Sequence, residues 1–282
     1  MSAAREGGGI GENQPIVKAV YTSGMANIEK HAPGSFCWME LATSDQTAAK
    51  AFYSELFGWM AKDSPMGPDN FYTTFSLGGR KSAACYALQA DEVAKRIPPH
   101  WKVYITVASA AASAERAKEV GGTVFCGPLD VATHGLMSTI ADPTGAVFNI
   151  WESKDHPGTG VQGENGAFCW ADLSTPDAKR AAEFYAGLFG WTTDLGKDDY
   201  THILNQGNYI GGIPPAAHRQ PGAPPHWLLY FQTDDCDAST EKAKQLGAKI
   251  YFGPVTMEKV GRMTVLADPQ GAIFSLFQPL PH

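Results

Sequence analysis

Residues 34–59 read GSFCWMELATSDQTAAKAFYSELFGW, and residues 166–191 read GAFCWADLSTPDAKRAAEFYAGLFGW. The two stretches keep a constant offset of 132 residues and share an FCW triplet, an FY pair and an LFGW ending. A match of this length at a fixed spacing indicates a duplicated structural unit. The chain of 282 residues is long enough for two such units, each of which can bury its own core.

Each stretch predicts a strand that leads into a helix. Residues 36–42 alternate as a strand does, which places Cys37, Met39 and Leu41 on one face. Trp38 and Glu40 are then expected on the other face. An apolar stripe at helical spacing follows, so a helix packs one side against the strand.

The ends of these helices have recognisable signals. Thr43, followed three residues later by Gln46, predicts an N-cap with a capping box. In the second copy, Pro176 is expected at the first helical position. Gly58 and Gly190 fit the left-handed residue that ends a helix.

The rest of each copy predicts a second unit of the same kind. PPHW at 98–101 and at 224–227 opens it, although the offset there is 126 residues, so the second copy has a shorter connection. A strand and a helix over 108–120 follow in the first copy. The sequences at 142–145 and 268–271, DPTG and DPQG, predict the turns before the last strands, so Asp142 and Asp268 are expected to be turn residues. We therefore predict an α+β fold with four βαβββ units, two in each copy.

The domain organisation follows from the repeat. We expect a first domain at 34–153, a polar and Gly-rich linker at 154–165 and a second domain at 166–282. Residues 1–33 lie outside the repeat and form either a disordered tail or an arm, in which 16–21 would pack on the body.

Composition and charge restrict the classes of function. The net charge of −7 is spread along the chain without a Lys/Arg cluster, so nucleic acid and membrane surfaces are not expected partners. No apolar run is long enough to span a bilayer. Five scattered cysteines argue against a disulfide framework and for a reduced compartment. Because the N-terminus lacks the apolar core of a signal peptide, we expect a cytoplasmic protein.

Together these motifs resemble the vicinal oxygen chelate superfamily, which includes glyoxalase I, extradiol dioxygenases, fosfomycin-resistance enzymes and bleomycin-binding proteins. The matching features are the strand–helix opening with FY and LFGW, the central PPHW and the closing DPxGA, over about residues 34–152 and 166–280. The resemblance implies two tandem cup-like domains, each an incomplete barrel made from one curved sheet. The helices would lie outside each cup and the ligand inside it.

The resemblance also implies a divalent metal in the members that carry out chemistry, held by His, Glu or Gln from three strands. The matching positions here are Trp38, Lys102, Asn149, Trp170, Leu228 and Ser275. None offers an imidazole or a carboxylate. We therefore predict no metal site and no cofactor. His100 and His226 lie two residues before the second ligand position, on the same strand face.

Strand alternation predicts which side chains face each cup and could bind a ligand. For the first cup these are Trp38, Glu40, His100, Lys102, Tyr104, Asn149 and Trp151. For the second cup these are Trp170, Asp172, His226, Leu228, Tyr230, Ser275 and Phe277. Aromatic walls with a few polar groups are typical of a small-molecule pocket. The first cup is the better equipped of the two.

Each candidate also has a structural interpretation. The two tryptophans could fill the cups as core residues. Glu40 could form an ion pair with Lys102. The two histidines after Pro-Pro could hydrogen-bond at the entry to their strands.

Three functions follow from these patterns. The first is a metal-independent protein that binds a small apolar or aromatic molecule. The second is an enzyme of glyoxalase, dioxygenase or hydroxylase type, for which the fold alone argues. The third is a structural or interaction protein whose cups are filled by their own side chains. We expect a monomer whose domains pair as an internal pseudo-dimer, or a homodimer.

Overall fold

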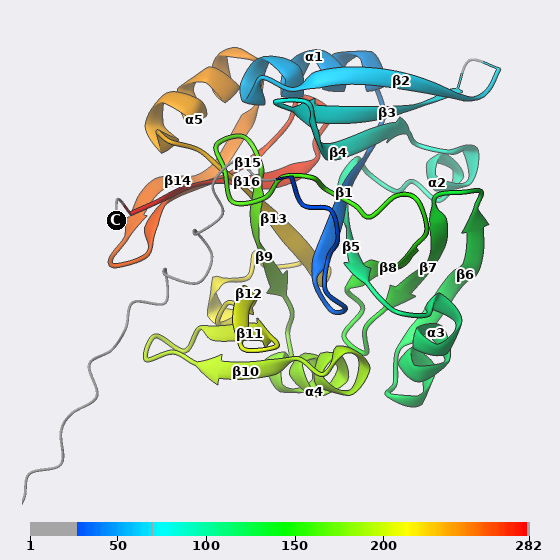
Figure 1. Ribbon diagram of the computed structural model, residues 1–282. Coiled ribbons are helices and arrows are strands. Elements are labelled where there is room, and N and C mark those ends of the chain that lie inside the picture. Colours follow the sequence, from blue (N-terminus) through cyan, green and yellow to red (C-terminus); the bar gives the residue numbers. More distant parts are fainter. Residues whose placement is uncertain (1–26, 69, 281–282) are drawn as a thin grey trace, which may run out of the picture.

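A computed structural model describes residues 27–68 and 70–280, which form two open eight-stranded sheets (Figure 1). The strand order is β2-β3-β4-β1-β5-β8-β7-β6 in the first sheet and β10-β11-β12-β9-β13-β16-β15-β14 in the second. In each sheet the two central strands, β1 and β5 or β9 and β13, run antiparallel. The α+β class and the tandem cup-like architecture are confirmed.

The four predicted βαβββ units are all present. The first half contains β1 (Phe36–Thr43), α1 (Gln46–Phe57), β2 (Met60–Gly67), β3 (Asn70–Leu77), β4 (Arg80–Ala87), α2 (Ala90–Ala94), β5 (His100–Thr106), α3 (Ala110–Glu119), β6 (Thr123–Val131), β7 (Gly135–Ala141) and β8 (Val147–Ser153). The second half contains β9 (Phe168–Ser174), α4 (Ala178–Phe189), β10 (Thr192–Leu195), β11 (Thr201–Asn205), β12 (Asn208–Ile213), the 3-10 turn η2 (Ala216–His218), β13 (His226–Gln232), α5 (Cys236–Gln245), β14 (Lys249–Met257), β15 (Gly261–Ala267) and β16 (Ile273–Pro279).

The N-terminal caps of α1 and α4 differ from the prediction. Asp45 caps α1 by accepting a hydrogen bond from the Ala48 backbone N–H at 2.9 Å, whereas Thr43 ends the preceding strand. In the second copy Asp177 is the cap, and Pro176 lies outside the helix. An aspartate both accepts from the free N–H groups and places negative charge at the positive end of the helix. The glycine that ends each helix has a left-handed φ angle of 70° or 73°, as predicted.

The alternation of β1 is interrupted at Cys37. The pairing between β1 and β5 shifts between Phe36 and Trp38, which makes Cys37 the extra residue of a β-bulge. Phe36 and Met39 therefore both lie in the core beneath the helices, while Cys37 packs with Trp38 on the opposite face. The prediction that Cys37 shares a face with Met39 is wrong. All five cysteines are free, in agreement with the sequence prediction.

The two halves share one hydrophobic core. Helix α1 lies beside α5, and α3 lies beside α4, so the helices of one half contact those of the other (Figure 1). The Phe36 ring meets Phe168, Trp191 and Trp227 of the second half edge to face, at centroid distances of 5.9, 5.6 and 5.3 Å. Such aromatic pairs add to the free energy that burial alone supplies.

Reciprocal hydrogen bonds join the halves inside this core. The Tyr53 hydroxyl donates to Asp268 at 2.9 Å, and the equivalent Tyr185 hydroxyl donates to Asp142 at 3.2 Å. The other oxygen of each aspartate accepts backbone N–H groups of its own turn. The predicted turn role is confirmed, and each turn also bonds the other half.

The indoles of the two LFGW endings cross between the halves in the same reciprocal way. Trp59 Nε1 donates to the Gly166 carbonyl at 2.8 Å, and Trp191 Nε1 donates to the Gly34 carbonyl at 2.9 Å. Both indoles are buried. The motif that identified the repeat therefore holds the repeats together.

The segment between the domains is packed rather than free. Residues 158–161 are buried, and the Thr159 N–H donates to the Cys37 carbonyl at 2.7 Å. Gly158 has a φ angle of 120°, and a Cβ at this position would lie 2.2 Å from the Cys37 carbonyl oxygen. Arg80 and Glu164 form a two-pronged ion pair with both N–O distances at 2.7 Å. The connecting segment is therefore held against the first half by both backbone and side-chain contacts.

The end of the N-terminal segment also contacts this connection. The Ile28 N–H donates to the Gly160 carbonyl at 2.9 Å, and His31 Nε2 lies 2.9 Å from the Thr159 carbonyl. The stretch 16–21, which was expected to act as an arm, lies outside the described residues.

We predict that Tyr53→Phe and Tyr185→Phe each lower the free energy of unfolding by about 1–3 kcal/mol, because each change leaves a buried aspartate oxygen without its donor. Urea denaturation of the full chain measures this loss. The matched control is Tyr209→Phe, whose hydroxyl bonds Asp194 at the surface at 3.1 Å. Equal effects for all three variants would contradict a special role for the buried bonds.

Candidate functional site

The cup face of each sheet, opposite the shared core, carries a separate apolar cluster. In the first sheet it consists of Cys37, Trp38, Tyr72, Ala84, Tyr104, Val131, Met137 and Trp151. In the second sheet it consists of Cys169, Trp170, Leu228, Tyr230, Val255, Met257, Met263, Val265 and Phe277. Aromatic candidates from both predicted cups are thus gathered on one face of each sheet.

A carboxylate lies at the centre of the first cup. Glu40 is only 8% exposed, and its two oxygens accept hydrogen bonds from Tyr72 at 2.8 Å and from Tyr104 at 2.7 Å. Trp38 Nε1 donates to the Tyr72 oxygen at 2.9 Å. We call these four residues the first carboxylate cluster.

The second cup repeats this arrangement. Asp172 is 6% exposed and accepts hydrogen bonds from the hydroxyls of Tyr200 and Tyr230, the latter at 2.8 Å. Trp170 Nε1 lies 2.9 Å from the Tyr200 oxygen and 3.0 Å from Asp172 Oδ1. We call these four residues the second carboxylate cluster. Burial raises the pKa of Asp172 to about 6, although the hydrogen bonds from Tyr200, Tyr230 and Trp170 act to lower it.

Sequence reasoning missed two members of these clusters, Tyr72 and Tyr200. Both lie at the starts of strands or just before them, and their separation of 128 residues matches neither the offset of 132 nor that of 126. The only available signal was an aromatic residue at the entry of an alternating strand in each copy.

Lys102 does not pair with Glu40, so the predicted ion pair is wrong. The two residues are register partners on neighbouring strands. The Lys102 ammonium instead lies 3.0 Å from Glu92 of α2 and stacks over the Tyr86 ring, whose hydroxyl it also contacts. Each oxygen of Glu40 already accepts a hydrogen bond from a tyrosine hydroxyl. The carboxylate of Glu92 is partly exposed and lies within reach of the lysine ammonium.

The two predicted histidines bond at the entries to their strands, as their structural interpretation states. His100 Nδ1 lies 2.9 Å from the Pro98 carbonyl, and His226 Nδ1 lies 2.8 Å from the Pro224 carbonyl. Burial lowers the pKa of His100. The ring is therefore neutral at neutral pH.

The polar candidates on the last strands, β8 and β16, form hydrogen bonds to the neighbouring strands of their own sheets. Asn149 Oδ1 accepts from Thr139 at 2.7 Å, and the Ser275 hydroxyl donates to the Thr264 carbonyl at 2.9 Å. Both are essentially inaccessible, at 1% and 0% exposure. The structure therefore places them beneath the cup surface rather than at a position to meet a ligand.

The connecting segment covers part of the first cup. The His156 ring lies edge to face on Trp38 at 4.6 Å, and its carbonyl accepts from Trp151 Nε1 at 2.8 Å. Burial lowers the pKa of His156 to about 4, so the covering ring is uncharged at neutral pH. Trp38 is 4% exposed, whereas the equivalent Trp170 is only half-buried. The second cup therefore has the more accessible lining.

The donor set of the cups does not fit a divalent metal. The residues that meet in register across the central strands are Trp38, Tyr104 and Asn149 in the first sheet, and Trp170, Tyr230 and Ser275 in the second. Transition metals in such cups need several imidazole or carboxylate ligands. Within residues 27–68 and 70–280, no three His, Cys, Asp or Glu residues lie close enough to hold an ion.

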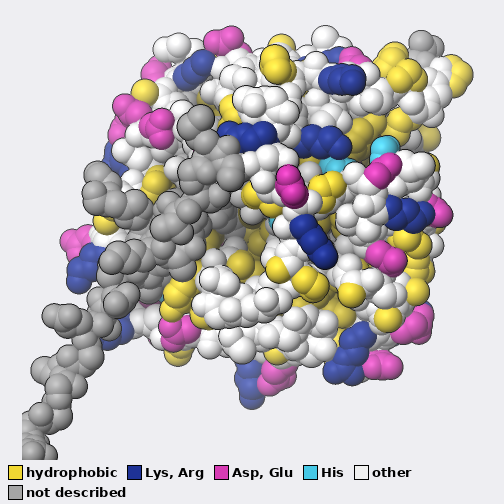
Figure 2. All heavy atoms as spheres, in the orientation of Figure 1, with side chains coloured by type: hydrophobic (Ala, Val, Ile, Leu, Met, Phe, Trp, Pro, Cys, Tyr) yellow, Lys and Arg dark blue, Asp and Glu magenta, His cyan; other side chains and the backbone are white. Residues whose placement is uncertain are grey.

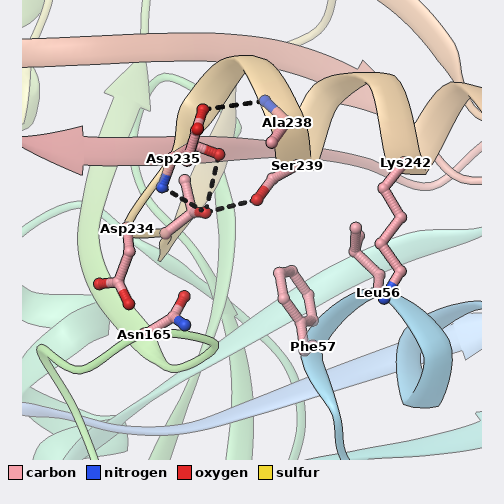
Figure 3. A pocket seen from close by; sticks show the side chains of 9 residues that line it. Leu56, Phe57, Asn165, Asp234, Asp235, Ala238, Ser239 and Lys242 are labelled. Atoms are coloured by element: carbon pink, nitrogen blue, oxygen red, sulfur yellow. Dashed lines mark hydrogen bonds between the residues drawn. The ribbon is translucent and has the colours of Figure 1, made fainter.

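Two hollows lie away from the cups. One of about 300 Å³ lies between α1 and α5, and Figure 3 shows Phe57 facing the start of α5 across it. One of its polar residues stabilises the start of α5: Asp235 accepts a hydrogen bond from the Ala238 N–H at 2.9 Å and caps the helix. The other, of about 600 Å³, is a groove between α4 and β10 whose floor includes Trp191. Neither gathers a set of catalytic side chains.

One face of the molecule carries charges of both signs. On the face seen in Figure 2, Lys and Arg side chains are interspersed with Asp and Glu. In the part of the chain that the structure describes, no helix is both long and apolar enough to cross a membrane.

Family models match both halves. A glyoxalase-like domain matches residues 38–151, and the model of the glyoxalase/bleomycin resistance protein/dioxygenase superfamily matches residues 168–276. The chain belongs to this superfamily. The resemblance inferred from the repeat motifs is confirmed, and both matches lie inside the domains expected from the sequence.

Two relatives of this superfamily member span nearly its whole length. It is 35% identical over 265 residues to a putative glyoxylase, CFP32, of Mycobacterium tuberculosis, which covers 92% of this chain and 100% of the relative. It is 33% identical over 264 residues to the anthracycline biosynthesis protein DnrV of Streptomyces peucetius, covering 88% of this chain and 94% of the relative.

Solved structures of other superfamily members share the fold. The Mn(II)-bound glyoxalase from Novosphingobium aromaticivorans superposes with a TM-score of 0.63 at 16% identity, covering 88% of this chain and 83% of the other. The 2,3-dioxygenase LapB from Pseudomonas sp. KL28 superposes with a TM-score of 0.61 at 11% identity, covering 89% and 95%.

We predict that Asp172 makes stability depend on pH. Its pKa rises from 3.8 to about 6 on folding, so the folded protein keeps this proton to higher pH than the unfolded chain does. Ionisation of Asp172 therefore removes stability as the pH rises from about 4 to about 6, by roughly 3 kcal/mol, since a tenfold change in proton affinity corresponds to about 1.4 kcal/mol.

Urea denaturation at a series of pH values tests this dependence. The difference in unfolding free energy between the wild type and Asp172→Asn should fall by that amount across the range. The control Glu183→Gln, on the exposed face of α4, should show no comparable change. A constant difference for Asp172→Asn would contradict the prediction.

Proposed function

We propose that this superfamily member binds a small, largely aromatic molecule on the cup face of its second sheet, without a divalent metal. One observation carries the proposal: the apolar lining of the second cup is partly exposed and lies around a buried carboxylate cluster. The sequence favoured the first cup, because more of its predicted cup-facing side chains are polar. The covering by His156 and the burial of Trp38 favour the second cup instead.

The lining of the second cup suits a flat apolar body. Trp170, Leu228 and Val265 are half-buried, and Met263 and Phe277 keep 7% and 8% of their surfaces exposed. Small-molecule sites are mostly apolar and aromatic with a few polar groups that set the orientation of the ligand. Methionine and aromatic side chains also adapt to ring systems of different outline.

The name of one relative supports a ligand of this kind. One is named an anthracycline biosynthesis protein, and anthracyclines are polycyclic aromatic compounds. A ring system of that type has the planar apolar surface that the lining of the second cup would cover.

A metal-independent enzyme is the second candidate. A pKa of about 6 lets Asp172 exchange a proton near neutral pH, which is what a general acid or base needs. The relative named a putative glyoxylase also favours an enzyme. In this candidate Asp172 would accept a proton from the bound molecule, and Tyr200 and Tyr230 would hold the carboxylate in place.

We predict that Leu228→Arg weakens binding of bicyclic and tricyclic aromatic compounds at least about tenfold, because the long charged side chain would occupy the second cup. Tryptophan fluorescence titration of the full chain measures the affinity. The control Leu195→Arg changes a leucine that is 67% exposed on β10 and should leave the affinity unchanged.

Two outcomes would contradict this proposal. If no compound of the panel changes the fluorescence or the melting temperature of the wild type, the cups do not accept aromatic molecules. If Leu228→Arg binds as the wild type does, the ligand lies elsewhere.

We also predict that the affinity for an aromatic ligand stays within about twofold after treatment with a chelator such as EDTA, since no metal is proposed to take part. Elemental analysis of untagged protein should find much less than one Fe, Mn, Ni, Zn or Co per chain. A stoichiometric metal whose removal abolishes binding would show that the donor-set argument is wrong.

A further inference from the structure

The hydrogen bonds around Asp172 fix the direction of the protons in the second carboxylate cluster. An ionised carboxylate has no proton and can only accept. The Tyr200 and Tyr230 hydroxyls each have one proton, and both donate it to Asp172. The single N–H of the Trp170 indole points to the Tyr200 oxygen and Asp172 Oδ1, at 2.9 and 3.0 Å. Only lone pairs remain for a bound molecule.

In the first carboxylate cluster the hydrogen bonds run in the same direction, toward the carboxylate, although the acidic residue is different. Glu40 replaces aspartate, and Tyr72 and Tyr104 donate to its two oxygens while the Trp38 indole donates to Tyr72. Glutamate is one methylene longer than aspartate, so the two copies reach the same network with carboxylates of different length. The feature common to both cups is therefore a carboxylate whose tyrosine partners present only acceptor oxygens.

The charge of Asp172 is not balanced inside the second cup. Its register partner on β13 is Leu228, whereas the same position in the first cup is Lys102. Among the described residues, Asp172 has hydrogen-bond donors but no ion-pair partner. A buried anion in apolar surroundings attracts cations and hydrogen-bond donors and repels other anions.

We propose that the second cup selects aromatic molecules that direct a hydroxyl or ammonium donor at this cluster, and that it discriminates against those with an anionic group there. The inference rests on the proposed binding function and adds the chemical class of the ligand. The ring system would lie against Leu228, Met263 and Phe277. Its donor would bond the tyrosine oxygens or the free lone pair of the carboxylate.

Four naphthalene probes of nearly equal size test this selection by isothermal titration of the full chain at about pH 8. We expect 2-naphthol and 2-naphthylmethylamine to bind at least about tenfold more tightly than 2-methoxynaphthalene, which has no donor. This ratio is the usual effect of one hydrogen bond to a charged partner. The anion 2-naphthoate should bind most weakly.

The variant Asp172→Asn keeps the shape of the side chain but removes its charge and gives it an N–H donor. It should reduce the preference for 2-naphthol over 2-methoxynaphthalene to about twofold or less. The exposed control Glu183→Gln should keep the wild-type preference. The ranking of the four probes on the wild type does not depend on how well any variant folds.

The outcomes separate this inference from the proposed function. Equal affinities for the four probes, or tightest binding of 2-naphthoate, would overturn the inference and leave aromatic binding intact. Binding that retains the donor preference but is insensitive to Leu228→Arg would place the selection outside the second cup and overturn the inference. Failure of every probe to bind would overturn both.

Discussion

Two reciprocal hydrogen bonds, from Tyr53 to Asp268 and from Tyr185 to Asp142, join the two halves of the chain. Each half supplies the donor of one bond and the acceptor of the other. Each aspartate shapes the turn before the last strand of its own sheet and accepts a tyrosine from a helix of the other half. Since both bonds lie inside a continuous aromatic core, breaking either one would leave buried polar groups unpaired. The positions of the two sheets therefore depend on this interface.

This interface determines which faces remain for function. The helices and one face of each sheet are used in the shared core, so the opposite faces are left to form the cups. Each cup then contains a buried carboxylate, and two tyrosine hydroxyls donate hydrogen bonds to it in both copies. The duplicated chain thus contains two versions of one hydrogen-bonded carboxylate cluster.

The two versions differ in their covering and in their charge. In the first cup, His156 of the connecting segment lies on Trp38, and Lys102 brings a cation that Glu92 already pairs. In the second cup Trp170 is half-buried, and Leu228 leaves the carboxylate without a counter-ion. The first cup is therefore the more covered of the two, and the second is the one in which we propose that a ligand binds.

The sequence by itself determined the duplication, the four βαβββ units and the superfamily, because these depend on periodic patterns and turn residues that act locally. It also placed Trp38, Glu40, Trp170 and Asp172 on the cup faces through strand alternation. Only the tertiary structure decided the partners of Glu40, the exchange of Tyr53 and Tyr185 between halves, and the covering of the first cup. These features join residues that lie far apart in the chain. A long side chain such as Lys102 can reach more than one carboxylate, and only the packing of the folded protein determines which of them it pairs with.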